Sequence, residues 1–335
     1  MGPVTPSVWI VVLNWNNGRD TVECLQSIQQ ARDPAVTGVV VCDNGSSDDS
    51  CELIRAWARD AHVDLAEHLW HSPAFTPAVP AGAAAGNASV PRFVLVQTGA
   101  NLGFAGGNNV GLCFVQQLGF DGAVLLLNND VLVTPGCVSA MAKRLASDPQ
   151  VGMCGCTVLY HFAPDTVQAW GGARFQPWLA RASHLGAHAS MNTPRDATAV
   201  ERQLDYILGA SLMISARCLA AIGLMEERYF LYYEEIDWAL RARRQGFTLA
   251  YVPEAVVFHK EGGTIGSSAD KSRRSLLSEH YLVRSCLLFT RKFYPWYLPT
   301  VVAYSLLLSL RVLLRGDRRR ASTRVRAMLG MSWQR

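Results

Sequence analysis

Short apolar runs alternate with helical patterns in the first half of the chain. The apolar runs lie at residues 8–13, 38–42, 93–96 and 123–127, and each is followed by a polar or glycine-rich turn. This alternation is typical of βα units arranged around a mainly parallel sheet. Because ligands of open α/β sheets bind outside the carboxyl ends of the strands, the four turns are the first places to look for chemistry.

The second half shows isolated strands with longer connections between them. Residues 204–215 predict one buried strand with a bend at Gly209, followed by a helix over 216–222 that ends at Gly223. Residues 62–92 are rich in Ala, Pro, Gly and His, and this composition predicts a flexible surface insertion.

Composition excludes two classes of protein. Of the 335 residues, 50% are hydrophobic and 17% are charged, which does not suit an intrinsically disordered or fibrous chain. The nine cysteines are scattered without a CxxC pair or zinc-ligand spacing, so we expect mostly buried thiols in a reducing compartment. The first apolar run lacks the basic flank and cleavage pattern of a signal peptide, which predicts a catalytic part in the cytoplasm.

Charge divides the chain into an acidic body and a basic tail. Residues 281–335 carry eleven Lys or Arg and one acid, Asp317, and within them residues 293–310 are uncharged and include aromatic side chains. An apolar segment with basic flanks is typical of association with an anionic membrane surface, and a core helix followed by a solvated basic tail is the alternative. We expect a body over 1–265 and a helical membrane-associating region over 266–335.

Three of the polar turns carry candidate ligand-binding groups. In the fourth turn, residues 128–130, Asp130 follows a leucine run at a strand end, where a carboxylate can hold a divalent metal together with a substrate diphosphate. The second turn, 43–46, offers the Asp43 carboxylate and backbone N–H groups at a helix start. The third, 101–109, has glycines where the backbone must approach something closely, but their spacing is not that of a dinucleotide-binding fingerprint. Alone, the fourth turn is also consistent with a strand-to-loop cap, and the second with a common Asx-Gly turn.

An acidic cluster opens a predicted helix that stops at Gly246. Glu234 and Asp237 share one face of this helix, and Glu235 points about 100° away. Clustered carboxylates repel one another unless a cation or a shared proton relieves them, so a raised pKa and a general-base role are one interpretation. A solvated helix N-terminus stabilised by the helix dipole is the other. His259, at the end of a later apolar run, is a candidate ligand or a structural histidine.

Seven blocks, in order, resemble the family 2 glycosyltransferases of the GT-A fold, and among them the rhamnosyltransferase-like branch that builds bacterial surface polysaccharide. The blocks are VVLNWNNGRDTVECLQSI, VVVCDNGSSDDS, NLGFAGGNNVGL, VLLLNNDVLVTP, LDYILGASLMISARCLAAIG, YFLYYEEIDWALRARRQGF and YVPEAVVFHKEGG. They cover about residues 8–263. The resemblance implies an α/β fold with a Rossmann-like, mainly parallel sheet flanked by helices.

The resemblance also implies roles for individual residues. Glu234 and Glu235 match the acidic pair that supplies the catalytic base, with Asp237 beside them in the same block. Asp130 stands at the family's DXD position and is the only carboxylate there, and His259 matches a position that adds a metal ligand in some relatives. The residues implied to shape the nucleotide pocket are Asn14, Asn16, Asp43, Asn44, Asn101, Gly103, Gly106, Asn108, Asn128 and Asn129.

The implied reaction is the inverting transfer of a sugar from a nucleotide diphosphate. A divalent metal, Mg²⁺ or Mn²⁺, would neutralise the leaving diphosphate while a carboxylate deprotonates the acceptor hydroxyl. By resemblance, the donor is dTDP-L-rhamnose and the acceptor is a glycan or a polyprenyl-linked glycan. We expect a cytoplasmic enzyme that associates peripherally with the inner face of the cell membrane and binds no nucleic acid.

Two other functions stay open at this point. A nucleotidyltransferase could use a similar sheet and metal-binding carboxylates, but it should carry a basic, glycine-rich triphosphate loop near the first strand, and NWNNGRD is a poor match to one. A noncatalytic, membrane-associated sugar-binding or scaffold protein would not be affected by changes at Glu234, Glu235 or Asp130.

Overall fold

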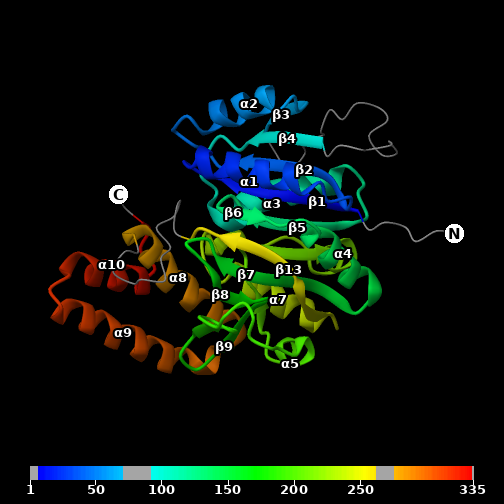
Figure 1. The fold of residues 1–335 in the computed structure, drawn as a ribbon. Coiled ribbons are helices and arrows are strands. Elements are labelled where there is room, and N and C mark those ends of the chain that lie inside the picture. The colour runs from blue at the N-terminus through cyan, green and yellow to red at the C-terminus, as the bar shows by residue number, and fades with distance from the viewer. Residues whose placement is uncertain (1–6, 71–91, 262–274, 334–335) are drawn as a thin grey trace.

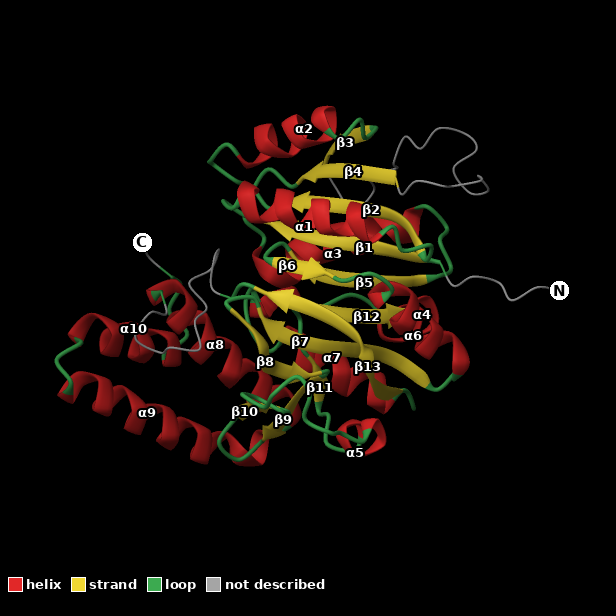
Figure 2. Cartoon of the chain, viewed as in Figure 1, coloured by secondary structure: helices red, strands yellow, loops and turns green. Residues whose placement is uncertain are grey.

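A large mixed sheet with helices on both faces forms the centre of the molecule (Figure 1, Figure 2). The computed structural model describes residues 7–70, 92–261 and 275–333. The ten strands of the sheet follow the order β3-β4-β2-β1-β5-β12-β7-β13-β6, and β8 pairs with β7. The strands are β1 (Val8–Asn14), β2 (Val36–Asp43), β3 (Leu65–Leu69), β4 (Arg92–Gln97), β5 (Ala123–Asn128), β6 (Val131–Val133), β7 (Val151–Tyr160), β8 (Ala163–Trp170), β12 (Ser211–Ser215) and β13 (Thr248–His259).

Strands β3, β4, β2, β1 and β5 are parallel, and β1 is buried on both faces. Ile10 and Val12 of β1 point into one hydrophobic core, while Trp9 and Val11 point into the other. A sheet covered by helices on both sides needs such continuous apolar strands. The helices over the first core are α1 (Gly18–Ala31), α2 (Ser50–Asp60) and α4 (Cys137–Ser147), and those over the second are α3 (Gly103–Gln117), α6 (Ala216–Ile222) and α7 (Glu234–Arg244).

The single bent strand predicted over residues 204–215 is wrong. The structure divides it into β11 (Tyr206–Ile207), which joins a small antiparallel sheet, and β12, which joins the large one. The two strands diverge around Gly209, where an added Cβ would overlap the carboxylate of Glu235. The other members of the small sheet are β9 (Gly172–Gln176) and β10 (Arg181–His184), and the short helix α5 (Ala197–Glu201) follows them.

Other predicted elements are confirmed, with one addition. The four apolar runs of the first half are β1, β2, β4 and β5, and the helix expected over 216–222 is α6, which ends at Gly223 with φ +70°. The segment expected to be an insertion, 62–92, begins with a strand, because β3 pairs in parallel with β4 at the edge of the sheet. Residues 71–91 of this segment lie outside the described part of the chain.

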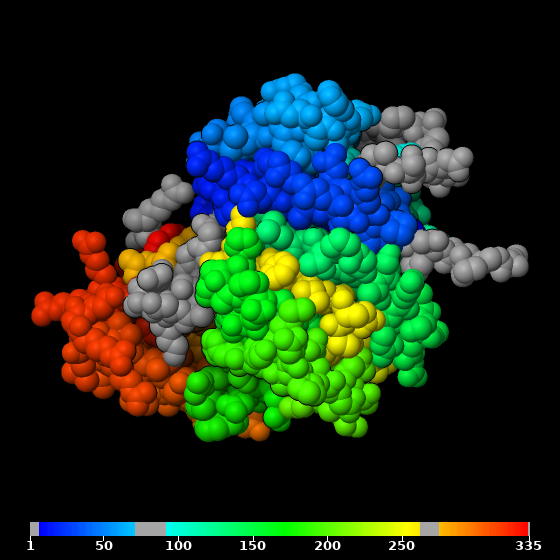
Figure 3. Space-filling view, viewed as in Figure 1, coloured from blue at the N-terminus to red at the C-terminus, as the bar shows by residue number. Residues whose placement is uncertain are grey.

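Three helices end the chain and extend beyond the body, as the orange and red surface in Figure 3 shows. The boundary expected at residue 265 falls within 262–274, outside the described residues. The segment Pro295–Leu314 is 20 residues long and, by length and composition alone, apolar enough to cross a membrane. Only 17% of its 18-residue apolar window is buried in the structure. The three helices are α8 (Leu276–Phe293), α9 (Leu298–Leu314) and α10 (Arg318–Met328), with the 3₁₀ turn η2 (Pro295–Tyr297) between the first two.

Candidate active site

The polar turns that stood out in the sequence meet in one pocket at the carboxyl ends of the strands. Residues at or just beyond the ends of β1, β2, β5 and β13, and the start of α3, form its wall. The lining residues are Leu13, Trp15, Asn44, Asn101, Gly103, Phe104, Asn128, Asn129, Asp130, Phe230, Leu231, His259 and Leu277. Six of them were not among the candidate site residues of the sequence, namely Leu13, Trp15, Phe104, Phe230, Leu231 and Leu277.

Some residues implied to shape the nucleotide pocket lie behind its wall instead. The amide of Asn14 donates to Oδ1 of Asp43 at 2.8 Å and accepts from the Thr21 hydroxyl at 2.7 Å. Asn129 donates to the same hydroxyl at 2.9 Å, so this buried network ties the first, second and fourth turns together. Of the residues implied to shape the nucleotide pocket, five do not line it: Asn14, Asn16, Asp43, Gly106 and Asn108. The candidate catalytic residues Glu234, Glu235 and Asp237 do not line it either.

The third turn is locked against a segment that precedes the acidic pair. Asn44 donates to the carbonyl oxygen of Gly103 at 3.0 Å and accepts from the N–H of Leu102 at 2.9 Å. Gly103 has φ +76°, and a Cβ there would overlap the carbonyl oxygen of Phe230. That oxygen accepts from the N–H of Phe104 at 2.6 Å. Only glycine combines this backbone conformation with so close an approach.

Asp130 and His259 both line the pocket and contact each other. Nε2 of His259 lies 3.1 Å from Oδ1 of Asp130, and both side chains are about nine-tenths buried. Nδ1 of His259 lies 2.8 Å from Oε1 of the buried Gln168, on β8, so Nδ1 carries the proton of this contact. Burial acts to raise the pKa of Asp130. The charge and hydrogen bond of His259, together with the charge of Lys260, outweigh burial, so the pKa of Asp130 lies below its ordinary value.

Asp130 and His259 could supply two ligands to a divalent cation. With a cation bound, the hydrogen bond to Gln168 would keep the proton of His259 on Nδ1 and fix the ring, and the Nε2 lone pair would be available to the ion beside the Asp130 carboxylate. In the described part of the chain, no three His, Cys, Asp or Glu side chains gather as a metal site. One carboxylate and one imidazole therefore suit an ion whose remaining ligands are water and substrate phosphate.

The acidic pair lies at the start of α7. Glu234 is 2% exposed, and its Oε2 has no hydrogen-bond partner among the described residues. Burial, and then the neighbouring Glu235, raise the pKa of Glu234 well above its ordinary value. Burial raises the pKa of Glu235 to about 7, while hydrogen bonds from backbone groups, including that of Gly209, act in the opposite direction. A carboxyl group with a pKa near neutrality is suited to exchange a proton with a substrate.

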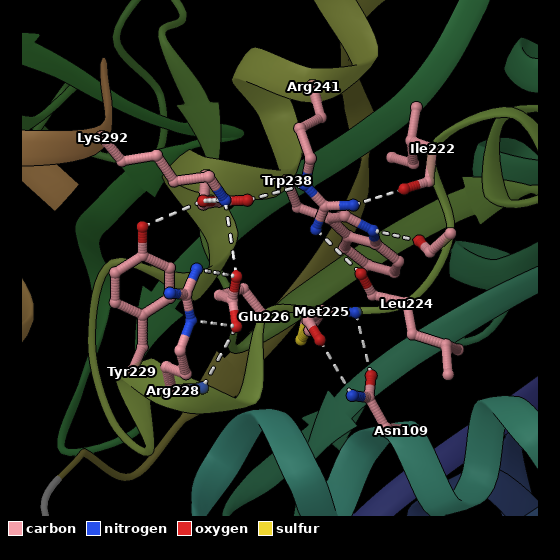
Figure 4. Close-up of polar contacts among 12 residues, drawn as sticks. Asn109, Ile222, Leu224, Met225, Glu226, Arg228, Tyr229, Trp238, Arg241 and Lys292 are labelled. Atoms are coloured by element: carbon pink, nitrogen blue, oxygen red, sulfur yellow. Dashed lines mark hydrogen bonds and ion pairs between the residues drawn. The ribbon is translucent and has the colours of Figure 1, made fainter. Parts of the chain in front are cut away.

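Asp237 has a different environment from its two neighbours, because it contacts Tyr229, Arg241 and Lys292, which are labelled in Figure 4. Its side chain is fully buried, and its oxygens accept from Tyr229 at 2.9 Å, from Nε of Arg241 at 2.6 Å and from Lys292 at 2.5 Å. Arg241 also donates to the carbonyl oxygens of Ile222 and Leu224. These contacts occupy Asp237 within a network that connects α7 to the preceding loop and to α8.

The residues just before the acidic pair adopt an unusual backbone. Phe230, Tyr232 and Tyr233 have φ values of +61°, +67° and +73°, in the left-handed region that side chains disfavour. Helix α8 supports this segment: Tyr281 stacks on Phe230 at 4.4 Å between ring centroids, and the hydroxyl of Ser285 donates to the carbonyls of Tyr229 and Leu231. The C-terminal helices therefore begin with a component of the site itself, which the sequence patterns did not reveal.

Comparison with curated proteins identifies named relatives. The chain is 27% identical over 255 residues to an N-acetylglucosaminyl-diphospho-decaprenol L-rhamnosyltransferase of Mycobacterium tuberculosis, covering 70% of this chain and 80% of that protein. It is 23% identical over 203 residues to the rhamnosyltransferase WbbL of Escherichia coli, covering 58% of this chain and 76% of that protein.

Solved structures show the same fold. A mannosyltransferase from Pyrobaculum calidifontis, in complex with GDP-Man and Mn²⁺, matches with a TM-score of 0.52 at 14% identity, covering 98% of this chain and 87% of that one. GalNAc-T7 with UDP, GalNAc and Mn²⁺ matches with a TM-score of 0.57 at 14% identity, covering 96% of this chain and 55% of that one. The fold is GT-A-like, as the sequence resemblance implied. The sequence model described as "Glycosyltransferase like family 2" matches residues 6–277, and the chain belongs to this family.

Proposed function

We propose that this glycosyltransferase transfers L-rhamnose from dTDP-L-rhamnose to a glycan carried on a polyprenyl diphosphate. The two named bacterial relatives are rhamnosyltransferases, and one of them is named for N-acetylglucosaminyl-diphospho-decaprenol. The observation that carries the proposal is the Asp130–His259 pair in the lining of a pocket built from the strand-end turns. A carboxylate and an imidazole placed there suit the diphosphate of a nucleotide sugar together with its cation.

In this proposal, Asp130 and His259 hold Mg²⁺ or Mn²⁺. When bound, the ion supplies positive charge against the negative charge that develops on the leaving diphosphate. Gln168 keeps the imidazole oriented through its contact with Nδ1. The two similar structures that contain Mn²⁺ support the choice of cation. Asn44, Asn101, Asn128 and Asn129, which line the pocket, offer amide groups to the nucleotide.

We assign the role of general base to Glu235. Glu235 is partly exposed, and its pKa of about 7 suits proton exchange at neutral pH. Glu234 is 2% exposed, so it is less open to an acceptor hydroxyl. As the acceptor oxygen attacks the anomeric carbon, its proton passes to Glu235, and the bond to the donor diphosphate breaks on the opposite face. Attack from the face opposite the leaving group inverts the anomeric centre. Asp237, held by Lys292 and Arg241, positions the helix that carries Glu235.

Peripheral membrane association forms the last part of the proposal. Helix α9 exposes Leu306, Leu307, Leu310 and Leu314, and basic side chains lie close to both of its ends. An exposed apolar helix with basic flanks is suited to the interface of an anionic bilayer, where a polyprenyl-linked acceptor resides.

A thermal-shift experiment tests the donor site. Wild-type protein, Asp130→Asn and the exposed control Asp121→Asn would be melted with dTDP-, UDP- and GDP-sugars, with and without Mn²⁺. We expect a metal-dependent rise in melting temperature with dTDP-rhamnose in the wild type and the control, and its loss in Asp130→Asn, because a ligand bound to the native state stabilises it by mass action. A shift with another sugar nucleotide alone would overturn the assigned donor. A shift that persists in Asp130→Asn would overturn the assigned metal site.

A further inference from the structure

A second hollow lies between α8 and α10, outside the donor pocket. The first turn of α8 forms one side, and α10 forms the other with Arg318, Arg319 and Arg326. We refer to this hollow as the α8–α10 groove. Leu277 lines both the groove and the donor pocket, so the two cavities are adjacent.

The acidic side chains next to the groove are occupied by other arginines. Glu279 of α8 is paired with Arg324 and Arg320 of α10, and Asp317 caps α10 and contacts Arg320. Among the described residues, no carboxylate forms an ion pair with Arg318 or Arg319. The positive charge of these two guanidinium groups is therefore not neutralised within the groove.

A buried histidine supplies independent evidence that the groove takes a ligand. His280 lines it and is 2% exposed, and its Nε2 has no hydrogen-bond partner among the described residues. Its ring lies against Tyr281 and Trp333, with centroid distances of 5.2 and 5.6 Å, so its orientation is fixed. A buried ring nitrogen left without a partner is costly unless a ligand or water satisfies it.

The backbone favours an anion at the same place. α8 is 18 residues long and has its N-terminus, the positive end of its dipole, in the groove. Guanidinium groups form strong paired hydrogen bonds with phosphate oxygens, and hydroxyls such as that of Ser322 can add further ones. Helix α9, which leads into α10, exposes its leucines, so a lipid chain would have an apolar surface close by.

We propose that the α8–α10 groove binds the phosphate or diphosphate group of a lipid. Arg318 and Arg319 pair with the phosphate oxygens, and His280 completes the site from the α8 side. The groove is separate from the metal site at Asp130, so this inference does not depend on the identity of the donor.

Vesicle binding of the full-length protein tests the proposal. Phosphatidylcholine vesicles would contain phosphatidylglycerol or polyprenyl diphosphate at equal surface charge, and inorganic diphosphate would serve as a soluble competitor. The variants are Arg318→Gln/Arg319→Gln and His280→Phe, which retains an aromatic ring for the contact with Trp333. The matched control is Arg311→Gln/Arg315→Gln, which removes the same charge from exposed positions outside the groove.

We expect both groove variants to weaken binding by roughly tenfold or more, and the control to weaken it less. Stronger binding to polyprenyl diphosphate than to phosphatidylglycerol would identify the lipid-linked acceptor as the source of the phosphate, and equal binding would identify the phospholipid headgroup. An equal loss in the groove and control variants would overturn the proposal, because it would show general attraction to charge. Donor-induced thermal shifts, measured on every variant, would show that the protein is folded and would keep this result distinct from a failure of the donor site.

Discussion

Nζ of Lys292, near the end of α8, lies 2.5 Å from Oδ2 of Asp237, which belongs to the helix that carries the acidic pair. The Asp237 side chain is fully buried, and Lys292 also lies 3.6 Å from Glu226. The ion pair joins the first C-terminal helix to α7. Together with the stacking of Tyr281 on Phe230, it makes α8 part of the enzyme body, whereas α9 presents its leucines to solvent.

Replacing Lys292 with Met is expected to destabilise the protein. Asp237 would lose one of its two positively charged partners in a buried position, at a cost of roughly 1–3 kcal/mol in the free energy of unfolding. Urea denaturation would measure this cost, with Arg291→Met, one residue earlier on the exposed surface of α8, as the matched control. In a double-mutant cycle with Asp237→Asn, additive effects would show that the pair is not coupled.

Gly209→Ala is expected to reduce activity far more than stability. The new Cβ would overlap the carboxylate of Glu235, which is the mobile end of a side chain, so the carboxylate would move while the backbone stays in place. A displacement of about 1 Å can reduce kcat/KM by roughly a hundredfold. A sugar-transfer assay and a melting curve would measure the two effects. Gly172→Ala is the contrast, because its Cβ would meet the backbone oxygen of Tyr206 and should destabilise the fold itself. Full activity in Gly209→Ala would argue against Glu235 as the base.

The pH dependence of activity should report the ionisation of Glu235. Since the base must be deprotonated, we expect kcat/KM to fall as the pH drops below about 7, the pKa to which burial raises this carboxyl. Glu235→Gln should abolish most of the activity, and the activity left should not show this acid limb. A wild-type profile that stays flat down to about pH 5 would contradict the assignment.

Glu235 should also make stability depend on pH. Its pKa in the folded state, about 7, lies above the ordinary value of 4.5, so between these values the folded protein holds a proton that the unfolded chain has released. The free energy of unfolding therefore falls as pH rises through this window, and the cost above it is on the order of 1–3 kcal/mol. We expect Glu235→Gln to raise the melting temperature relative to wild type by a few degrees at about pH 8 and by much less at about pH 5. An equal effect at both pH values would show that the charge is not responsible.

Gln168→Leu is expected to weaken binding of the cation. Without an acceptor for Nδ1–H, the ring of His259 can turn or change tautomer, and loss of such an outer partner typically reduces metal affinity by roughly 10–100-fold. Titration with Mn²⁺ in the presence of dTDP would measure it. Gln168→Glu, which retains an acceptor, should restore most of the affinity. If Gln168→Leu binds Mn²⁺ as well as the wild type, His259 does not act as a ligand.

The sequence alone determined the sheet-forming half of the fold and the residue types at its carboxyl edge. Continuous apolar runs such as that of β1 can be stable only as strands covered on both faces, and the turns that follow them must then meet at one edge. Local pattern was therefore enough to make Asp130 and His259 candidates at strand ends, whereas Glu234 and Glu235 became candidates as an acidic cluster at a helix start and through the family resemblance. It was not enough for residues 204–215, because the bend at Gly209 depends on a side chain of α7 that is distant in the sequence.

Only the tertiary structure decided how the three acids of α7 differ. In the sequence, Glu234, Glu235 and Asp237 are equivalent carboxylates at a helix start, but the fold buries one without a partner for Oε2, raises the pKa of the second to about 7 and neutralises the third with Lys292. The hydrogen bond between Gln168 and His259 is likewise a product of the fold, because the two residues are 91 positions apart in the sequence. These differences arise from burial and from contacts distant in sequence, which no local pattern of hydrophobic and polar residues contains.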